Sequence, residues 1–144
     1  MKKLIIATLI MVAAGTSAFA ADVKVNNKVK VNFEALFSDA ENVNWSGKEN
    51  YILATFTLSE ERVEAYFGTD GELIGTIRNV DLKRLPISAI QKIKKDYAAY
   101  TITGSIEFEG ADEKSYYVSL EKGNKKETLE VSFYGTVSTF RGRK

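Results

Sequence analysis

The residues of this chain that could carry chemistry are its carboxylates, lysines and tyrosines. The sequence contains neither His nor Cys, so it lacks the Ser–His and Cys–His pairs that activate a nucleophile. The usual ligand sets of zinc, copper and non-haem iron are missing for the same reason. The chemistry left to consider is acid–base catalysis by paired carboxylates and the binding of a hard cation by oxygen ligands.

Neighbouring acidic residues include Asp39/Glu41, Glu60-Glu61 and Asp112-Glu113. Glycosidases need two carboxyl groups that face each other across a cleft, whereas these pairs fall in predicted turns or helix ends, where solvated carboxylates are ordinary. The segment Asp70-Gly71-Glu72 lacks the alternating Asp/Asn ligands and the distal Glu of a calcium loop, and it is typical of a turn. The sequence therefore predicts no catalytic residue, no metal site and no cofactor, and we do not expect an enzyme.

Recognition of another molecule is a different kind of chemistry, and one predicted sheet face is rich in side chains suited to it. Tyrosine and arginine combine a large contact area with a polar end, and they dominate the binding energy of protein interfaces. The simpler interpretation is that tyrosine is common in strands because it is a good strand former. The candidate partner-binding residues on this face are Tyr51, Leu53, Arg62, Glu64, Tyr66, Ile74, Arg78, Tyr117 and Tyr134.

The N-terminal segment has the three-part pattern of a secretory signal peptide. Lys2 and Lys3 form a basic start, residues 4–14 are apolar, and Ala18 and Ala20 are the small residues before a cut. The apolar run is shorter than the roughly 20 residues that cross a bilayer, and there is no Cys to acylate. We therefore expect residues 1–20 to be removed after Ala20, with no membrane insertion afterwards and a periplasmic or secreted product.

The remaining chain is long enough for one compact domain that is stable without disulfides. Without Lys2 and Lys3, 18 basic residues stand against 19 acidic ones. Nucleic acids and anionic membranes both reward a clustered positive field, so this near-neutral balance argues against either as the main partner.

Hydrophobic periodicity predicts the elements that would position the candidate face. Residues 21–32 are expected to be a partly ordered lead-in, followed by a short helix from Phe33 to Phe37 with Asn32 as its N-cap. From Val43 the period changes to two, and strands are expected at 51–58, 61–67 and 72–78. A two-residue turn at Ser59-Glu60 would place the apolar residues of the first two of these strands on one face. On the third, Leu73, Gly75 and Ile77 are expected to share that face, with Ile74, Thr76 and Arg78 opposite.

The second half of the chain repeats this order. A helix is expected after Pro86, followed by strands at 102–108, 116–122, 127–134 and 136–141. Tyr51-Ile52 and Tyr117-Val118 are 66 residues apart, as are Phe67 and Phe133, and such self-similarity is typical of a repeat. The predicted fold class is α+β, with tandem repeats of a helix plus a four-stranded antiparallel sheet at 33–80 and 81–144 and the helices packed on one sheet face.

Several short motifs resemble a known family. They are Ala40-x-x-Val43-x-Trp45, the Asp70-Gly71 turn, and the helix Leu85-Pro86-x-x-x-Ile90-x-x-Ile93. This pattern resembles the PepSY-like family of exported bacterial proteins, also described as β-lactamase-inhibitor-like, over nearly the whole chain from Phe33 onward. The resemblance implies helices on one face of an antiparallel sheet and a role in binding or inhibiting another exported protein, often a hydrolase.

The function expected from the sequence is therefore that of a non-enzymatic exported binding protein. Its partner would be an extracytoplasmic protein or peptide, bound through an exposed Tyr-rich sheet face. The alternative is a periplasmic carrier of a small ligand, or an envelope scaffold without a protein target. A deep apolar cavity between helix and sheet would favour the carrier, and an open Tyr-rich sheet would favour protein recognition. The sequence leaves the oligomeric state open.

Overall fold

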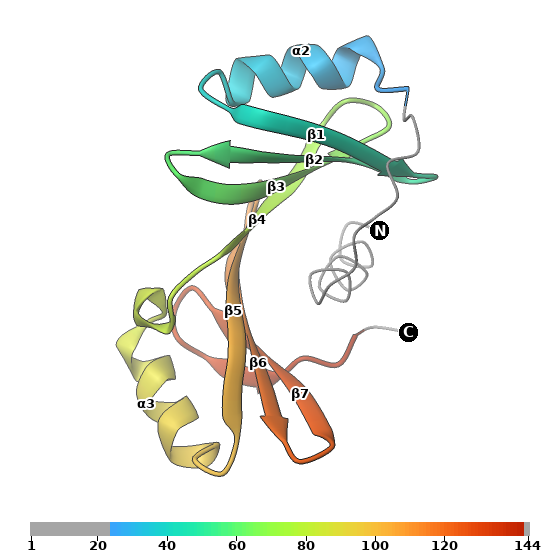
Figure 1. Cartoon of the computed structure of the whole chain (residues 1–144). Coiled ribbons are helices and arrows are strands. Elements are labelled where there is room, and N and C mark those ends of the chain that lie inside the picture. The colour runs from blue at the N-terminus through green and yellow to red at the C-terminus, as the bar shows by residue number, and fades with distance from the viewer. Residues whose placement is uncertain (1–23, 143–144) are drawn as a thin grey trace.

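The structure, a computed structural model, describes residues 24–142 (Figure 1). The predicted signal peptide and its cut after Ala20 lie outside these residues. Eight strands form one antiparallel sheet in which each strand pairs with the next along the chain. In chain order the elements are α2 (Asn27–Leu36), β1 (Glu41–Lys48), β2 (Tyr51–Leu58), β3 (Glu61–Gly68), β4 (Leu73–Asn79), the 3₁₀ turn η1 (Leu82–Arg84), α3 (Ile87–Asp96), β5 (Thr101–Gly110), β6 (Lys114–Lys122), β7 (Lys125–Ser132) and β8 (Val137–Thr139).

The predicted fold class is wrong. The strands do not form two four-stranded repeats, because β4 and β5 pair over five consecutive positions, from Gly75↔Gly110 to Asn79↔Ile106, and join all eight strands into a single sheet. Strands account for 51% of the described residues and the short helices for only 19%. The period-two pattern marks where strands lie, but it carries no information on which strands meet, and so it did not reveal the β4–β5 contact.

Both helices lie on the same side of this sheet. Val63 is buried beneath α2 and Tyr116 beneath α3. Cross-strand partners share a sheet face, and the pairs Val63↔Arg78, Arg78↔Glu107 and Glu107↔Tyr116 connect these two residues. Figure 1 shows α2 over β1–β3 and α3 beside β5, with the sheet turning sharply between its two halves.

Helix α2 begins earlier than predicted. Its N-cap is Asn26, whose side chain accepts a hydrogen bond from the backbone N–H of Val29, so residues 27–32 are helical and Asn32 lies inside the helix. Val29 and Phe33, four residues apart, are both buried on the sheet. The sequence predicts a partly ordered lead-in here, whereas the structure has a helix, because one face of this segment packs on the sheet. Asn32 instead donates to the carbonyl oxygen of Gly71 at 2.8 Å and fixes the β3–β4 turn against the helix.

The predicted register of β2 and β3 is confirmed. Leu58 faces Glu61, Phe56 faces Val63 and Ile52 faces Phe67, and the apolar members of these pairs lie in the core beneath α2. The turn achieves this register at a conformational cost, because Ser59 and Glu60 both have positive φ, 51° and 68°. Two positive φ values are typical of a type I′ turn, in which Asn-Gly is preferred.

The β2–β3 turn can therefore be improved without touching any packed residue. Replacing Ser59-Glu60 with Asn-Gly is expected to stabilise the protein by about 1 kcal/mol, because the new residues adopt positive φ with less strain. Urea denaturation would show this as a higher midpoint with an unchanged slope. Ala-Ala at the same positions serves as the control and should give no gain in stability. Equal midpoints for the two variants would show that the positive φ angles at positions 59 and 60 do not strain the turn.

The predicted faces of β4 are partly wrong. The pairing of β3 with β4 shifts register between Tyr66 and Phe67, so Tyr66 faces Gly75 while Phe67 faces Leu73. Such a bulge places one extra residue in β4 and reverses the side to which the later side chains point. Ile74 lies opposite the helices as predicted, but Ile77 joins it there, and Thr76 and Arg78 lie on the helix side.

The remaining predicted helix is confirmed as α3, which starts directly after Pro86 and buries Ala89 and Ile93 on β6 and β7. Among the helices of the described chain, none is both long and apolar enough to cross a membrane.

Candidate functional site

The sheet face opposite the helices carries an apolar cluster of its own. Five buried side chains, one from each of five successive strands, form a stripe across the middle of the sheet, and four partly buried side chains surround it. No helix of residues 24–142 packs on this cluster, since α2 and α3 belong to the two clusters on the other face. We call it the central stripe; its buried members are Tyr51, Tyr66, Ile77, Phe108 and Tyr117, and its border consists of Leu53, Ile74, Ile106 and Phe140.

The structure places the predicted tyrosines on this face but not in solvent. The exposed fractions of Tyr51, Tyr66 and Tyr117 are 7%, 1% and 4%, so the expectation that they form an exposed binding surface is wrong. The ring centroids of Tyr51 and Tyr66 are 5.6 Å apart, and Tyr117 packs edge-on against Phe140 at 5.2 Å. Aromatic neighbours on the bent sheet therefore cover one another. Tyr134 is 88% exposed, but it lies in the turn after β7 and not in the stripe.

Two of the buried tyrosines have acidic partners. The Tyr66 hydroxyl donates to Glu64 Oε2 at 2.9 Å, and the Tyr117 hydroxyl donates to Glu130 Oε1 at 3.4 Å. Burial and the nearby Glu64 raise the pKa of Tyr66 far above its ordinary value. Burial, with a contribution from Glu130, raises the pKa of Tyr117 to about 12. Both hydroxyls remain protonated donors at neutral pH, which fixes the two carboxylates at the edges of the stripe.

The other predicted site residues divide between the two faces. Leu53, Glu64 and Ile74 are half-buried beside the stripe, and Arg62 is exposed with its guanidinium 3.5 Å from Glu64 Oε1. Arg78 lies on the helix side, where its Nε donates to Glu107 Oε1 at 2.7 Å and its Nη1 to Glu61 Oε2 at 3.3 Å. Arg78 is therefore removed from the candidate face.

Glu107, the acidic partner of Arg78, occupies the junction between the two helix-covered cores. Its side chain is only 2% exposed, and Lys114 Nζ lies 3.2 Å from its second carboxylate oxygen. Burial alone would raise the pKa of Glu107, but the hydrogen bonds from Arg78 and Lys114 outweigh it and hold the pKa below its ordinary value. The group is a buried ion-pair network in which one carboxylate is shared by two cations.

Sequence reasoning missed the residues at the centre of the stripe. Phe108 is 1% exposed, and its ring lies over the paired glycines Gly75 and Gly110; a Cβ on Gly75 would come within 2.7 Å of that ring. A glycine in a strand often marks a close approach by another group, and this signal in the 72–78 segment could have identified the contact.

A hollow of about 450 Å³ with a mixed polar and apolar lining adjoins the stripe over β5, β6 and β7. Hydroxyl groups of Thr103, Ser119 and Thr128 line it together with Tyr117, and the ion pair between Lys126 and Glu121, at 3.0 Å, lies at its side. The hollow therefore places hydroxyl and charged groups next to the apolar stripe.

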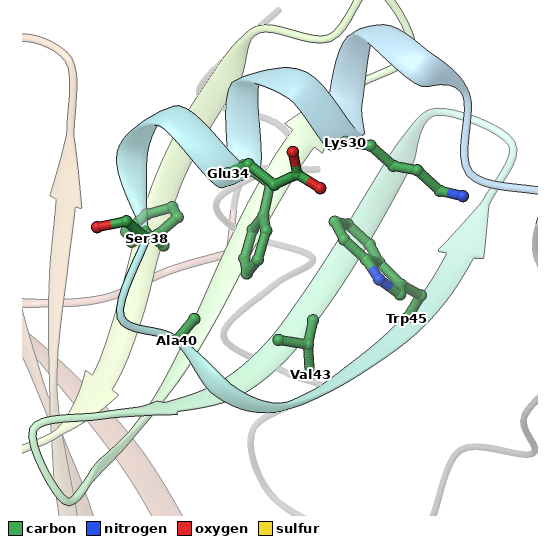
Figure 2. Close-up of a pocket in the computed structure, with 8 residues that line it drawn as sticks. Lys30, Glu34, Ser38, Ala40, Val43 and Trp45 are labelled. Carbon is green, nitrogen blue, oxygen red and sulfur yellow. The ribbon is translucent and has the colours of Figure 1, made fainter.

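A second hollow, of about 580 Å³, lies on the helix side between α2 and the edge strand β1 (Figure 2). Phe33, Phe37 and Trp45 contribute aromatic surface, and the ring centroids of Phe33 and Trp45 are 5.0 Å apart. Lys30 and Glu34 stand on the helix above it. In residues 24–142 no group of three acidic side chains could hold a metal ion, either here or elsewhere.

Comparison with known proteins identifies the fold. The sequence matches no protein-family model and no curated protein. Solved structures do match: a BLIP-like protein from Bacteroides fragilis NCTC 9343 has a TM-score of 0.74 at 17% identity, covering 85% of this chain and 89% of that one. A DUF2874 family protein from Bacteroides ovatus ATCC 8483 has a TM-score of 0.73 at 19% identity, covering 83% and 89%. A protein from Bacteroides eggerthii DSM 20697, assigned provisionally to the periplasm, has a TM-score of 0.72 at 13% identity, covering 81% and 90%.

These likenesses support the BLIP-like, or β-lactamase-inhibitor-like, part of the family resemblance as a fold. They do not extend to the PepSY-like part. At 13–19% identity, these structural matches establish the fold of this protein but do not identify a binding partner.

Proposed function

We propose that this protein is a non-enzymatic, exported binding protein that holds another extracytoplasmic protein or peptide against the sheet face opposite its helices. The observation that carries the proposal is the half-buried apolar border of the central stripe, Leu53, Ile74 and Ile106, on a sheet face that no described helix covers. Soluble proteins seldom leave contiguous apolar surface without a use, and such surface usually marks an interaction site. The BLIP-like fold, and a structural relative assigned provisionally to the periplasm, support the same function and compartment.

The structure changes which residues a partner would touch. The tyrosines form the floor, while the accessible surface comes from the half-buried border residues Leu53, Ile74 and Ile106, with Glu64 and Arg62 on the first half of the sheet. Leu and Ile here would supply desolvated contact area, and the charged pair would set orientation. Inhibition of a hydrolase is one form such binding could take.

Introducing positive charge into the apolar border tests this proposal. Leu53→Arg combined with Ile106→Arg should lower the affinity for the captured partner at least tenfold, because two apolar contacts at an interface centre are worth roughly 1–2 kcal/mol each. The partner would be captured from envelope extract on immobilised protein, identified by mass spectrometry, purified and titrated by calorimetry. Leu36→Arg with Ile87→Arg, two exposed positions on the helices, is the matched control. Equal affinity of the border variant and the control would refute the proposed face.

The tyrosines themselves are unsuitable for that experiment. Because Tyr51, Tyr66 and Tyr117 are buried, their replacement by serine would leave cavities and destabilise the fold, and lost binding would be uninformative. The carrier alternative predicts a deep apolar cavity between helix and sheet. The hollow between α2 and β1 opens to solvent along the sheet edge, so the geometry favours protein recognition over the enclosure of a small ligand.

A further inference from the structure

The hollow between α2 and β1 is a groove with one apolar floor and two different walls. The apolar surface is formed by Phe33 of α2, by Phe37 directly after that helix, and by the half-buried Val43 and Trp45 of β1. Lys30 and Glu34 lie four residues apart and so line the groove from one side of α2, and Ser38 lines it from the turn that follows the helix. Figure 2 shows the groove running along the helix, with Lys30 at the Trp45 end and Ser38 at the Ala40 end.

The other wall of the groove is an unused sheet edge. Within residues 24–142, β1 is the first strand of the sheet and pairs with β2 only. In an antiparallel edge strand alternate residues direct their backbone N–H and C=O groups away from the sheet, and these groups can pair with another strand. The edge is eight residues long, against three in β8 at the opposite edge. Bulges and short edge strands are common protections against such pairing, but β1 is irregular only between Glu41 and Asn44, which leaves the part beside Trp45 regular.

We propose that this groove binds an extended peptide, which adds to β1 as a further strand and inserts one large apolar side chain between Phe37, Val43 and Trp45. A strand placed between an edge strand and a helix obtains affinity from main-chain hydrogen bonds and specificity from the pockets that its alternate side chains enter. The site is on the opposite side of the sheet from the central stripe, and it does not depend on the function proposed above.

Charge complementarity defines the peptide further. Lys30 and Glu34 carry opposite charges one helical turn apart, and neither forms an ion pair with another described residue. The peptide that fits has an acidic residue toward Lys30 and a basic residue toward Glu34, each two positions from the apolar anchor so that all three side chains share a face. A lipid tail fits less well, because it cannot satisfy the backbone groups of β1.

The single tryptophan of the chain makes the groove directly observable, because Trp45 lies in it. The probes are the capped peptides Thr-Glu-Thr-Phe-Thr-Lys-Thr and Thr-Lys-Thr-Phe-Thr-Glu-Thr, titrated against the purified protein while Trp45 fluorescence is recorded. One charge order should bind roughly threefold more tightly than the other. Replacing the central Phe with Ser should weaken binding roughly tenfold or more.

Two variants of the protein decide the outcome. Reversing the rim with Lys30→Glu and Glu34→Lys, both exposed, should exchange the ranking of the two peptides. Val43→Glu in β1 should lower the affinity at least tenfold, whereas Val31→Glu, on the exposed side of α2, should leave it within twofold. The proposal is overturned if Trp45 does not respond to either peptide, if rim reversal leaves the ranking unchanged, or if decanoate binds and the peptides do not. A dimer that Val43→Glu dissociates in sedimentation would assign the edge to a second copy of the chain and would also overturn it.

Discussion

Replacing Glu107 with alanine is expected to lower the free energy of unfolding by about 3 kcal/mol. Glu107 accepts hydrogen bonds from Arg78 and lies within 3.2 Å of Lys114, so the variant loses two charged contacts and leaves two cations without their shared anion. Removing one partner of a buried pair typically costs 3–5 kcal/mol, and the lower end applies because Arg78 and Lys114 are each 29% exposed. Urea denaturation at pH 7 measures the difference.

The matched control is Glu109→Ala. Glu109 lies two residues further along β5, on the same sheet face, but it is 56% exposed and 3.9 Å from Lys114, so its loss should cost less than about 0.5 kcal/mol. Equal losses of unfolding free energy in Glu107→Ala and Glu109→Ala would mean that burial of the ion-pair network does not add to stability.

Acid should remove the contribution of Glu107. Its pKa in the folded protein lies below the ordinary value of 4.5, so the unfolded chain takes up the proton first as the pH falls. The stabilisation is complete above the unfolded pKa and disappears as the pH falls through the folded pKa. The difference between wild type and Glu107→Ala measured at pH 7 should therefore shrink progressively below about pH 4, and a difference independent of pH would contradict the ionised network.

Local features of the fold could be predicted from the sequence wherever one periodic pattern decided them. The faces of β2 and β3 followed from the alternation of Ile52, Phe56, Val63 and Phe67, because a one-residue slip would have exposed all four. That pattern outweighed an unfavourable turn. The Asp70-Gly71 turn also formed as predicted, with the Asp70 side chain accepting a hydrogen bond from the N–H of Glu72.

The features that could not be predicted depend on contacts between segments. The bulge opposite Tyr66 and Phe67 switches the sheet face to which the later side chains of β4 point. The alternation of residues 72–78 does not indicate the extra residue that causes it. The start of α2 depends on packing of Val29 on the sheet, which overrides the strand-like spacing of the preceding valines.

The candidate face was located on the correct side of β2, β3 and β6, but its exposure was not predictable. Alternation assigns a side chain to a face and says nothing of what lies beside it there. Tyr51 and Tyr66 are buried because each covers the other across neighbouring strands, and Tyr117 because Phe140 returns over it after the last strand. The stripe depends on the pairing of β2 through β6 as neighbours in one sheet, and the sequence pattern did not contain the β4–β5 pairing.

The contact at the centre of the stripe leads to the second large expected effect. Gly75→Val should destabilise the protein by about 3 kcal/mol, because the new Cβ would lie 2.7 Å from the Phe108 ring and 2.9 Å from the carbonyl oxygen of Glu109. Overpacking of this kind typically costs 1–3 kcal/mol, and the fixed backbone oxygen leaves little room to relax. The control is Gly104→Ala in β5, where an added Cβ would meet no atom within 4 Å and stability should change by less than about 0.5 kcal/mol.

A double-mutant cycle separates the ring from the backbone as the cause of the Gly75 effect. If Phe108 occupies the space above Gly75, the cost of Gly75→Ala should fall by about 1 kcal/mol when Phe108 is already leucine, since contacting residues are not additive. The rest of the destabilisation by Gly75→Ala should persist, because the carbonyl oxygen of Glu109 on the neighbouring strand would still lie close to the new Cβ. Additive effects in denaturant unfolding would mean that the ring does not press on Gly75. The same cycle bears on recognition, because Phe108 lies between the border residues Ile74 and Ile106: a displaced ring would raise the floor of the stripe and weaken partner binding even where the fold survives.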